Sequence, residues 1–331
     1  MYCKNWIVTW LIRELDLKNF TLGDAIKHYL QSSRYLSSMP DNALSERLVH
    51  LLNNCLRLDH ESMVQLCIKE QPNMFKRIFD VFAETALRHG SVSSGQYKNP
   101  WDTTKNVMIK PSKEVAEKIK VLKGHICDES QKLLLRFSSY QFMDELINDG
   151  GLFLQSASAY KMQENISIKD DELKLTLTRY LSKSDAEDAA KILRGLSGIS
   201  YMKSLEYTVT SPDYLVLCLT DAINYRMIAD WNAEAAVIIH NPDEFYKRLT
   251  HTTKDLRRNK MKLECGNVRY VDPYFDSYAI KAEDLPFCKS FKFAYQSEYR
   301  FVIRNSENLS NQDRKLFLGP LTDIATLVDL R

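Results

Sequence analysis

Apolar residues in the first part of the chain recur three and four positions apart, as they do on the buried face of an α-helix. The spacing is clearest in two runs, Leu44, Leu48, Leu51, Leu52 and Cys55, and Ile78, Val81, Phe82 and Leu87. Helix signals bracket the second run, because Pro72 suits the first turn of a helix and Gly90 suits the position after its end. The pattern predicts a helical domain over residues 1–90.

The composition of the chain and the pattern of its apolar residues change after this domain. Ser, Gly, Pro and Asn are frequent in 90–112, which is typical of a loop, and a short basic helix is expected at 112–123, so that 91–130 reads as a linker and basic helix. Short aliphatic and β-branched runs then alternate with helical stretches, at 133–137, 151–154, 214–220, 235–239, 268–271 and 301–303. We therefore expect an α+β chain in which a mixed sheet domain, 131–331, follows the helical domain.

Composition narrows the functional classes. A net charge of +2 on 331 residues gives no overall field that would single out nucleic acid or membrane as the partner. The 7 cysteines are scattered without CxxC spacing, which favours reduced thiols in a cytoplasmic protein and predicts no metal site. The apolar stretch 6–12 is too short to span a bilayer and has no signal-peptide cleavage site after it, so no membrane association is expected.

Candidate chemistry lies in 291–303, where the residue pattern predicts a β-strand. Gln296, Glu298 and Arg300 would share one face of that strand. The sequence has no Gly-rich phosphate loop, no GxSxG and no HExxH, which removes the commonest nucleotide-binding, hydrolase and metalloprotease classes. Taken alone, a Gln-x-Glu pair also fits the wet face of an edge strand.

The run Tyr295 to Arg300 resembles the signature strand of the mono-ADP-ribosyltransferase fold, which carries Gln or Glu two positions before a catalytic Glu. Other segments resemble parts of that fold in the same order, together covering 133–331: a first strand with an NAD-binding Arg at 135–139, the strand after the next helix at 150–156, a central strand at 217–220, and a closing strand and helix start at 317–325. The chain departs from the family at 160–165, where an Asn-Asp-Pro turn is common, and at Gln296, where a second carboxylate is common.

The resemblance implies a split β-sheet for 131–331 and a role for each matching residue. Glu298 would stabilise the oxocarbenium-like cation formed when nicotinamide leaves NAD+, and Gln296 would orient the acceptor. Arg136 would bind the phosphates, because a guanidinium offers a bidentate fork to an anion. The other implied NAD-binding residues are Phe137, Ser138, Tyr160 and Thr220. Of these, Thr220 would brace the Glu298 carboxylate, and Tyr160 or Phe137 would stack on the nicotinamide.

The expected activity is that of an NAD-dependent mono-ADP-ribosyltransferase, with NAD+ as substrate and a toxin or anti-phage role in bacteria. The acceptor would be a protein or a single-stranded nucleic acid. The nucleic acid is considered because the basic stretch 254–262 precedes the aromatic loop 270–278, and cations beside aromatic rings suit phosphate contact and base stacking. An antitoxin would bind the helical domain. Two alternatives stay open: an NAD glycohydrolase, with water as acceptor, and a non-catalytic binding protein on the same fold.

Overall fold

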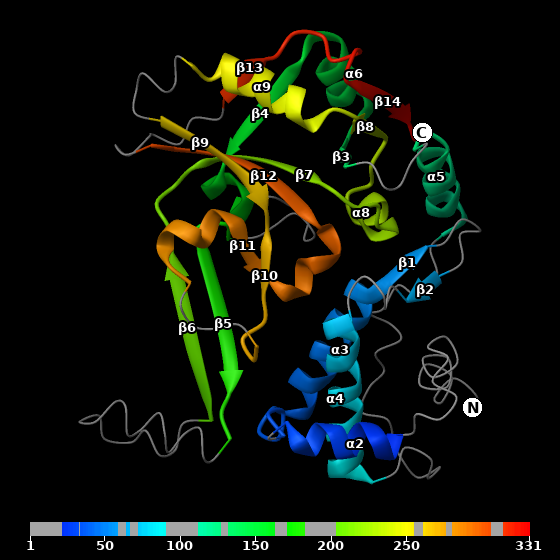
Figure 1. Cartoon of the computed structure of the whole chain (residues 1–331), viewed down its shortest axis with the longest axis vertical. Helices are drawn as coiled ribbons and strands as arrows, with labels where there is room; N and C mark the ends of the chain where they lie inside the picture. Colours follow the sequence, from blue (N-terminus) through cyan, green and yellow to red (C-terminus); the bar gives the residue numbers. More distant parts are fainter. Residues whose placement is uncertain are drawn as a thin grey trace.

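Helices dominate the N-terminal part of the computed structural model (Figure 1). This helical part contains α2 (Leu22–Gln31), α3 (Asp41–Cys55) and α4 (Pro72–His89), with a hairpin of β1 (Leu56–Leu58) and β2 (Val64–Leu66) that the helical pattern did not predict. Gly90 follows α4 with a φ of 82°, as expected for a glycine at a helix end. The structure describes residues 22–32, 34–58, 64–66, 72–90, 112–126, 132–162, 171–182, 203–254, 261–275, 280–305 and 314–331.

The predicted basic helix is present as α5 (Lys113–Gly124), and Ser112 caps it by accepting a hydrogen bond from the Val115 amide. The expected linker before it lies outside the described residues. No helix among the described residues is long and apolar enough to cross a membrane.

The rest of the chain is built on a sheet of eight strands, which confirms the predicted α+β class, but the pairings in this sheet are antiparallel where a mixed sheet was expected. Its central strand is β7 (Leu215–Thr220), and β12 (Glu298–Asn305) pairs along one edge of it with β9 (Met261–Asn267) beyond. The other edge of β7 is shared. There β4 (Gly151–Ser156) pairs with its first half and β3 (Leu134–Ser138) with its end. The sheet therefore splits into two wings beside β7.

Each wing of the sheet continues outward from β7. One runs from β4 to β13 (Arg314–Phe317), and the other runs from β3 through β8 (Ala235–Ile239) to β14 (Ala325–Asp329). The helix expected to start near 325 is thus a strand. Helices α6 (Tyr140–Asp149) and α9 (Pro242–Thr252) contribute buried residues to a core that also contains Leu217 and Phe301 of the sheet.

Smaller elements surround the sheet. A two-stranded ribbon consists of β5 (Lys174–Tyr180) and β6 (Ser204–Thr210), and a short parallel pair consists of β10 (Arg269–Val271) and β11 (Cys288–Ser290). The remaining elements are helix α8 (Tyr225–Asp230) and the 3-10 helices η2 (Ala157–Met162), η4 (Ala282–Phe287) and η5 (Phe291–Gln296).

The expected strand over 291–303 is wrong in its first half. Residues Phe291–Gln296 form η5, Ser297 has a φ of 42°, and the strand begins only at Glu298. The physical reason is packing: Phe291 and Tyr295 are four residues apart, and both are buried in a core shared with the helical part. The helical part and the sheet are joined by this continuous core.

Candidate active site

Glu298 is the first residue of β12 and lies directly opposite Thr220, the last residue of β7. Its backbone amide donates to the Tyr270 hydroxyl at 2.8 Å. The Thr220 hydroxyl donates to the carbonyl of Gln296 at 2.8 Å, so Thr220 braces the corner that precedes Glu298 rather than the carboxylate itself. The register nevertheless brings the two predicted residues side by side.

The Glu298 carboxylate belongs to a buried charge network of four residues, Glu172, Lys289, Glu298 and Arg300. Lys289 Nζ lies 2.8 Å from Glu298 Oε1 and 3.5 Å from Glu172 Oε1. Arg300 Nε lies 2.7 Å from Glu298 Oε2, and its two Nη atoms lie 2.8 and 2.9 Å from the Glu172 oxygens. All four residues are at most 6% exposed. The alternative, a wet face of an edge strand, is thus wrong, because Glu298 lies in an ion-paired interior.

The network fixes the ionisation of Glu298. Burial raises its pKa, but the neighbouring Arg300 and Lys289 charges outweigh burial and bring the pKa to about 2. Burial lowers the pKa of Arg300, but the carboxylates of Glu172 and Glu298 outweigh burial and hold it well above its ordinary value. Glu298 is therefore a permanent carboxylate at neutral pH, which suits electrostatic stabilisation and not proton donation.

Gln296 joins the network from η5 instead of from a shared strand face. Its Oε1 accepts from Lys289 Nζ at 3.1 Å, and the residue is 1% exposed. Lys289 thus connects Gln296 and Glu298. The sequence pattern had placed these two residues together on one face of a strand, which they do not share.

Arg136 lies across β7 from β12 and reaches into the split between the two wings. Cys218 lies between the points where β4 and β3 pair with β7, and Arg136 Nη1 donates to its carbonyl at 2.9 Å. Among the described residues no carboxylate pairs with this guanidinium, and burial lowers its pKa. Among the described residues the four charges of the network cancel, and Arg136 adds a positive charge without a carboxylate partner.

The other predicted NAD-binding residues differ in their surroundings. Phe137 packs in the core, with its ring centroid 5.9 Å from that of Trp231. Ser138 ends β3, and its carbonyl accepts from the Glu234 amide at 3.1 Å. Tyr160 lies on η2, where burial raises the pKa of its hydroxyl and Cys218 and Arg136 are electrostatic neighbours. These positions favour Tyr160 over Phe137 as a residue that could stack on a ligand.

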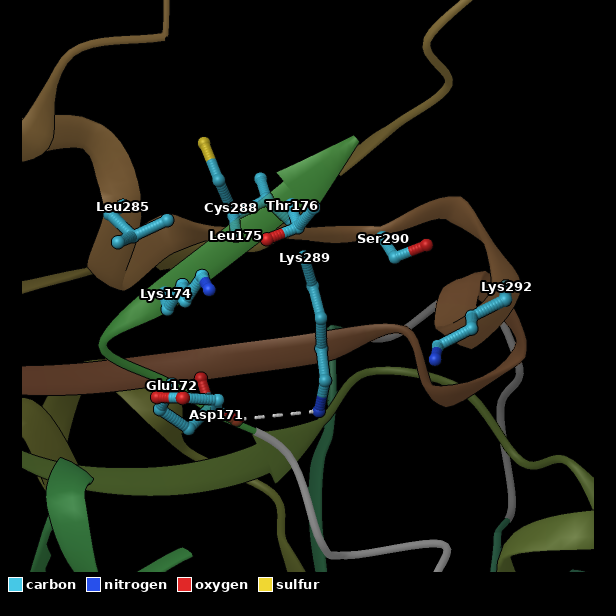
Figure 2. Close-up of a pocket in the computed structure, with 10 residues that line it drawn as sticks. All are labelled: Asp171, Glu172, Lys174, Leu175, Thr176, Leu285, Cys288, Lys289, Ser290 and Lys292. Atoms are coloured by element: carbon cyan, nitrogen blue, oxygen red, sulfur yellow. Dashed lines mark ion pairs between the residues drawn. The ribbon is translucent and has the colours of Figure 1, made fainter. Parts of the chain in front are cut away.

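A pocket of about 290 Å³ opens over the network, between β5 and β11 (Figure 2). Figure 2 shows Lys289 extending from β11 toward Glu172, and both residues line the pocket. Glu298 does not line it, so the Lys289 ammonium separates the pocket from the carboxylate. The other charged residues of the lining are Lys174, Lys292 and Asp171.

Sequence reasoning missed Glu172 and Lys289. Lys289 had a signal, because a lysine in an apolar and aromatic run so close to Glu298 is a candidate for a buried ion pair. Glu172 had none, since its partner Arg300 is 128 positions away in the sequence. Within the part of the chain that the structure describes, no cluster of His, Cys, Asp or Glu could hold a metal ion.

Comparisons of the chain with protein-family models, with curated proteins and with solved structures give no match.

Proposed function

We propose that this chain is an NAD-dependent mono-ADP-ribosyltransferase. The observation that carries the proposal is the pairing of a fixed carboxylate, Glu298, with a partly buried cation, Arg136, that has no carboxylate partner among the described residues, on the strands that flank β7. A buried charge without a counter-charge is unfavourable, and such charges occur where a ligand supplies the missing partner. A dinucleotide brings two phosphates, and a guanidinium binds phosphate in a bidentate geometry.

The reaction requires one fixed negative charge near the ribose. The bond between the ribose C1 atom and the nicotinamide nitrogen breaks, and its electron pair leaves with nicotinamide. A nucleophilic oxygen or nitrogen of the acceptor then bonds to the same carbon and releases its proton to solvent. Glu298 stabilises the cation that develops on the ribose. With a pKa of about 2 it is a poor proton acceptor, so the acceptor must supply its own nucleophilicity.

One contact has to change for this chemistry. Both Glu298 oxygens are occupied, Oε1 by Lys289 and Oε2 by Arg300. Arg300 is held in a bidentate pair with Glu172 and by the Pro286 carbonyl at 2.9 Å as well. Lys289 also contacts Gln296 at 3.1 Å and Glu172 at 3.5 Å, but it is a single ammonium on a flexible stem that lines the pocket. Lys289 is therefore the group that would withdraw when a ribose hydroxyl binds Glu298. The volume of the pocket, about 290 Å³, is near the lower end of the range for ligand-binding pockets, roughly 300 Å³. It is large enough for part of a dinucleotide.

The wider role is proposed by analogy with stand-alone bacterial enzymes of this fold, which often act as toxins in toxin–antitoxin or anti-phage systems. The acceptor is then a cytoplasmic macromolecule, either a protein or a single-stranded nucleic acid. A neutralising antitoxin would bind the helical part.

The test is incubation of the protein with labelled NAD+ and a cell lysate, followed by separate protease and nuclease digestion. Label released by protease alone identifies a protein acceptor, and label released by nuclease alone identifies a nucleic acid. Free labelled ADP-ribose without a labelled macromolecule favours the glycohydrolase. No label transfer and no loss of NAD+ would leave a binding protein.

The choice of inactive variant matters for this test. Glu298→Gln removes a charge from a balanced buried network, so inactivity could reflect misfolding. Glu298→Asp keeps the charge and shortens the side chain by one methylene, and Arg136→Met removes the unbalanced cation. Both variants are expected to fold and to lose transfer.

A further inference from the structure

The corner that carries Gln296 and Glu298 is held at both ends. At its far end, Thr220 binds the Gln296 carbonyl, and the Asp221 amide donates to the Ser297 carbonyl at 3.1 Å. At its near end, the side chain of Asn54 from α3 makes two hydrogen bonds with η5. Its Nδ2 donates to the Phe291 carbonyl at 2.7 Å, and its Oδ1 accepts from the Tyr295 amide at 2.9 Å.

This corner needs external support. A 3-10 helix has weaker hydrogen-bond geometry than an α-helix, and η5 is only 6 residues long. Ser297, which ends it, has φ and ψ of 42° and 51°, a left-handed conformation that a residue with a Cβ adopts only when its surroundings impose it. Gln296 and Glu298 lie on either side of Ser297, so the path of η5 sets the direction of both side chains.

One face of α3 is directed at this segment. Arg47 lies 5.1 Å from the centroid of the Phe291 ring, and His50 packs edge-on against the same ring at 5.9 Å. Arg47, His50 and Asn54 follow the spacing of one helical face. Asn54 is fully buried, and the residues it binds are 237 and 241 positions away. The helical part is thus built into the support of the candidate site.

We propose that Asn54 is a positioning residue for Gln296 and Glu298. Its carboxamide matches a backbone acceptor and a backbone donor of η5 at once, and so aligns the first residue of β12 from outside the sheet. This inference rests on the proposed function for its catalytic consequence, but the positioning itself can be measured without any turnover.

The experiment compares Asn54→Ala with a matched control, Tyr29→Phe, by amide hydrogen exchange and by NAD+ turnover. Tyr29 is also fully buried in the helical part, and its hydroxyl accepts from the Leu36 amide at 2.9 Å and donates to Glu84 at 2.9 Å without touching η5. Loss of two buried hydrogen bonds is expected to speed exchange in 291–299 by about tenfold or more in Asn54→Ala. Tyr29→Phe is expected to leave exchange in 291–299 unchanged.

Turnover separates positioning from general support. In Asn54→Ala, kcat is expected to fall by about tenfold to a hundredfold with KM for NAD+ nearly unchanged, because a misplaced carboxylate loses transition-state contacts. Asn54→Asp is the second variant, to be used if Asn54→Ala folds poorly. It retains an acceptor for the Tyr295 amide, so that amide is expected to exchange more slowly than in Asn54→Ala.

Three results would overturn the proposal: unchanged exchange in 291–299 for Asn54→Ala, an equal effect of Tyr29→Phe, or faster exchange with an unchanged kcat. If the wild-type protein turns over no NAD+, the proposed function fails, and exchange alone decides whether Asn54 holds the corner.

Discussion

Two arginines beside β7 are expected to respond to the same substitution to very different extents. Arg300→Met removes one of the two cations that pair with the buried carboxylates of Glu172 and Glu298, and leaves one negative charge of the network uncompensated. Leaving buried charges without a partner typically costs about 3–5 kcal/mol. Arg136→Met removes a cation whose hydrogen bond is to the Cys218 carbonyl and which has no carboxylate partner among the described residues. Losing that bond costs about 1–3 kcal/mol, and a part of the desolvation penalty of the cation is recovered.

The net expectation for Arg136→Met is a free energy of unfolding within about 1 kcal/mol of the wild type, since the loss and the gain are of similar size. Arg300→Met should be about 3–5 kcal/mol less stable. Urea unfolding measures both, provided that the slope with denaturant is the same in all three proteins.

Ligand binding supplies the second half of this test. NAD+ in large excess over its dissociation constant should raise the stability of the wild type, by about 2.7 kcal/mol at a hundredfold excess, and should leave Arg136→Met unchanged. A loss of stability in Arg136→Met as large as that in Arg300→Met would refute the reasoning, because it would mean that the Arg136 charge is already compensated in the free protein.

Three further predictions concern stability. Burial, with the charges of Lys292, Arg226 and Arg47, lowers the pKa of His50 to about 4. Between pH 6.5 and 4 the unfolded chain therefore binds a proton that the folded protein does not, and the free energy of unfolding falls by up to about 3 kcal/mol as the pH is lowered. His50→Phe should abolish this loss in urea titrations between those pH values. Ser297→Val should lose about 1–2 kcal/mol and Ser297→Gly should not, because only glycine adopts the left-handed conformation freely; equal midpoints of unfolding would contradict this. Asp272→Asn should lose about 3–5 kcal/mol in the same assay, because Asp272 pairs with the buried Arg47 at 2.7 Å and also with Arg77. Stability equal to the wild type would show that these ion pairs do not hold the helical part against the segment that carries Asp272.

Periodicity alone located much of the fold. The apolar run Ala235–Ile239 is a fully buried strand, Pro72 begins α4, and Ser112 caps α5 as the local signals indicate. Local signals failed at η5, where an aromatic-rich run suggests a strand although Phe291 and Tyr295 have helical spacing. Packing against α3 decides between the two, and the residues of α3 are more than 200 positions away.

Sequence patterns indicated three residues that the structure places close together, but not the charges that surround them. The resemblance named Arg136, Thr220 and Glu298, and the structure brings them onto three adjacent strands. It could not name Glu172, because the ion pair with Arg300 exists only once β12 and the segment before β5 meet in space. The ionisation of Glu298 depends on such pairs, so no local pattern could have predicted its low pKa.

The split in the sheet connects these observations. In a continuous sheet the backbone on this edge of β7 would pair with a neighbouring strand, and no side chain could reach the Cys218 carbonyl. Because β4 and β3 diverge, Arg136 fills the gap and leaves a cation beside a network whose own charges cancel. A fold selected only for stability would place an apolar side chain there, since a partly buried cation whose partner among the described residues is one carbonyl is unfavourable. A bound phosphate would remove that penalty, and binding of the anion and stabilisation of the sheet should therefore be coupled through Arg136.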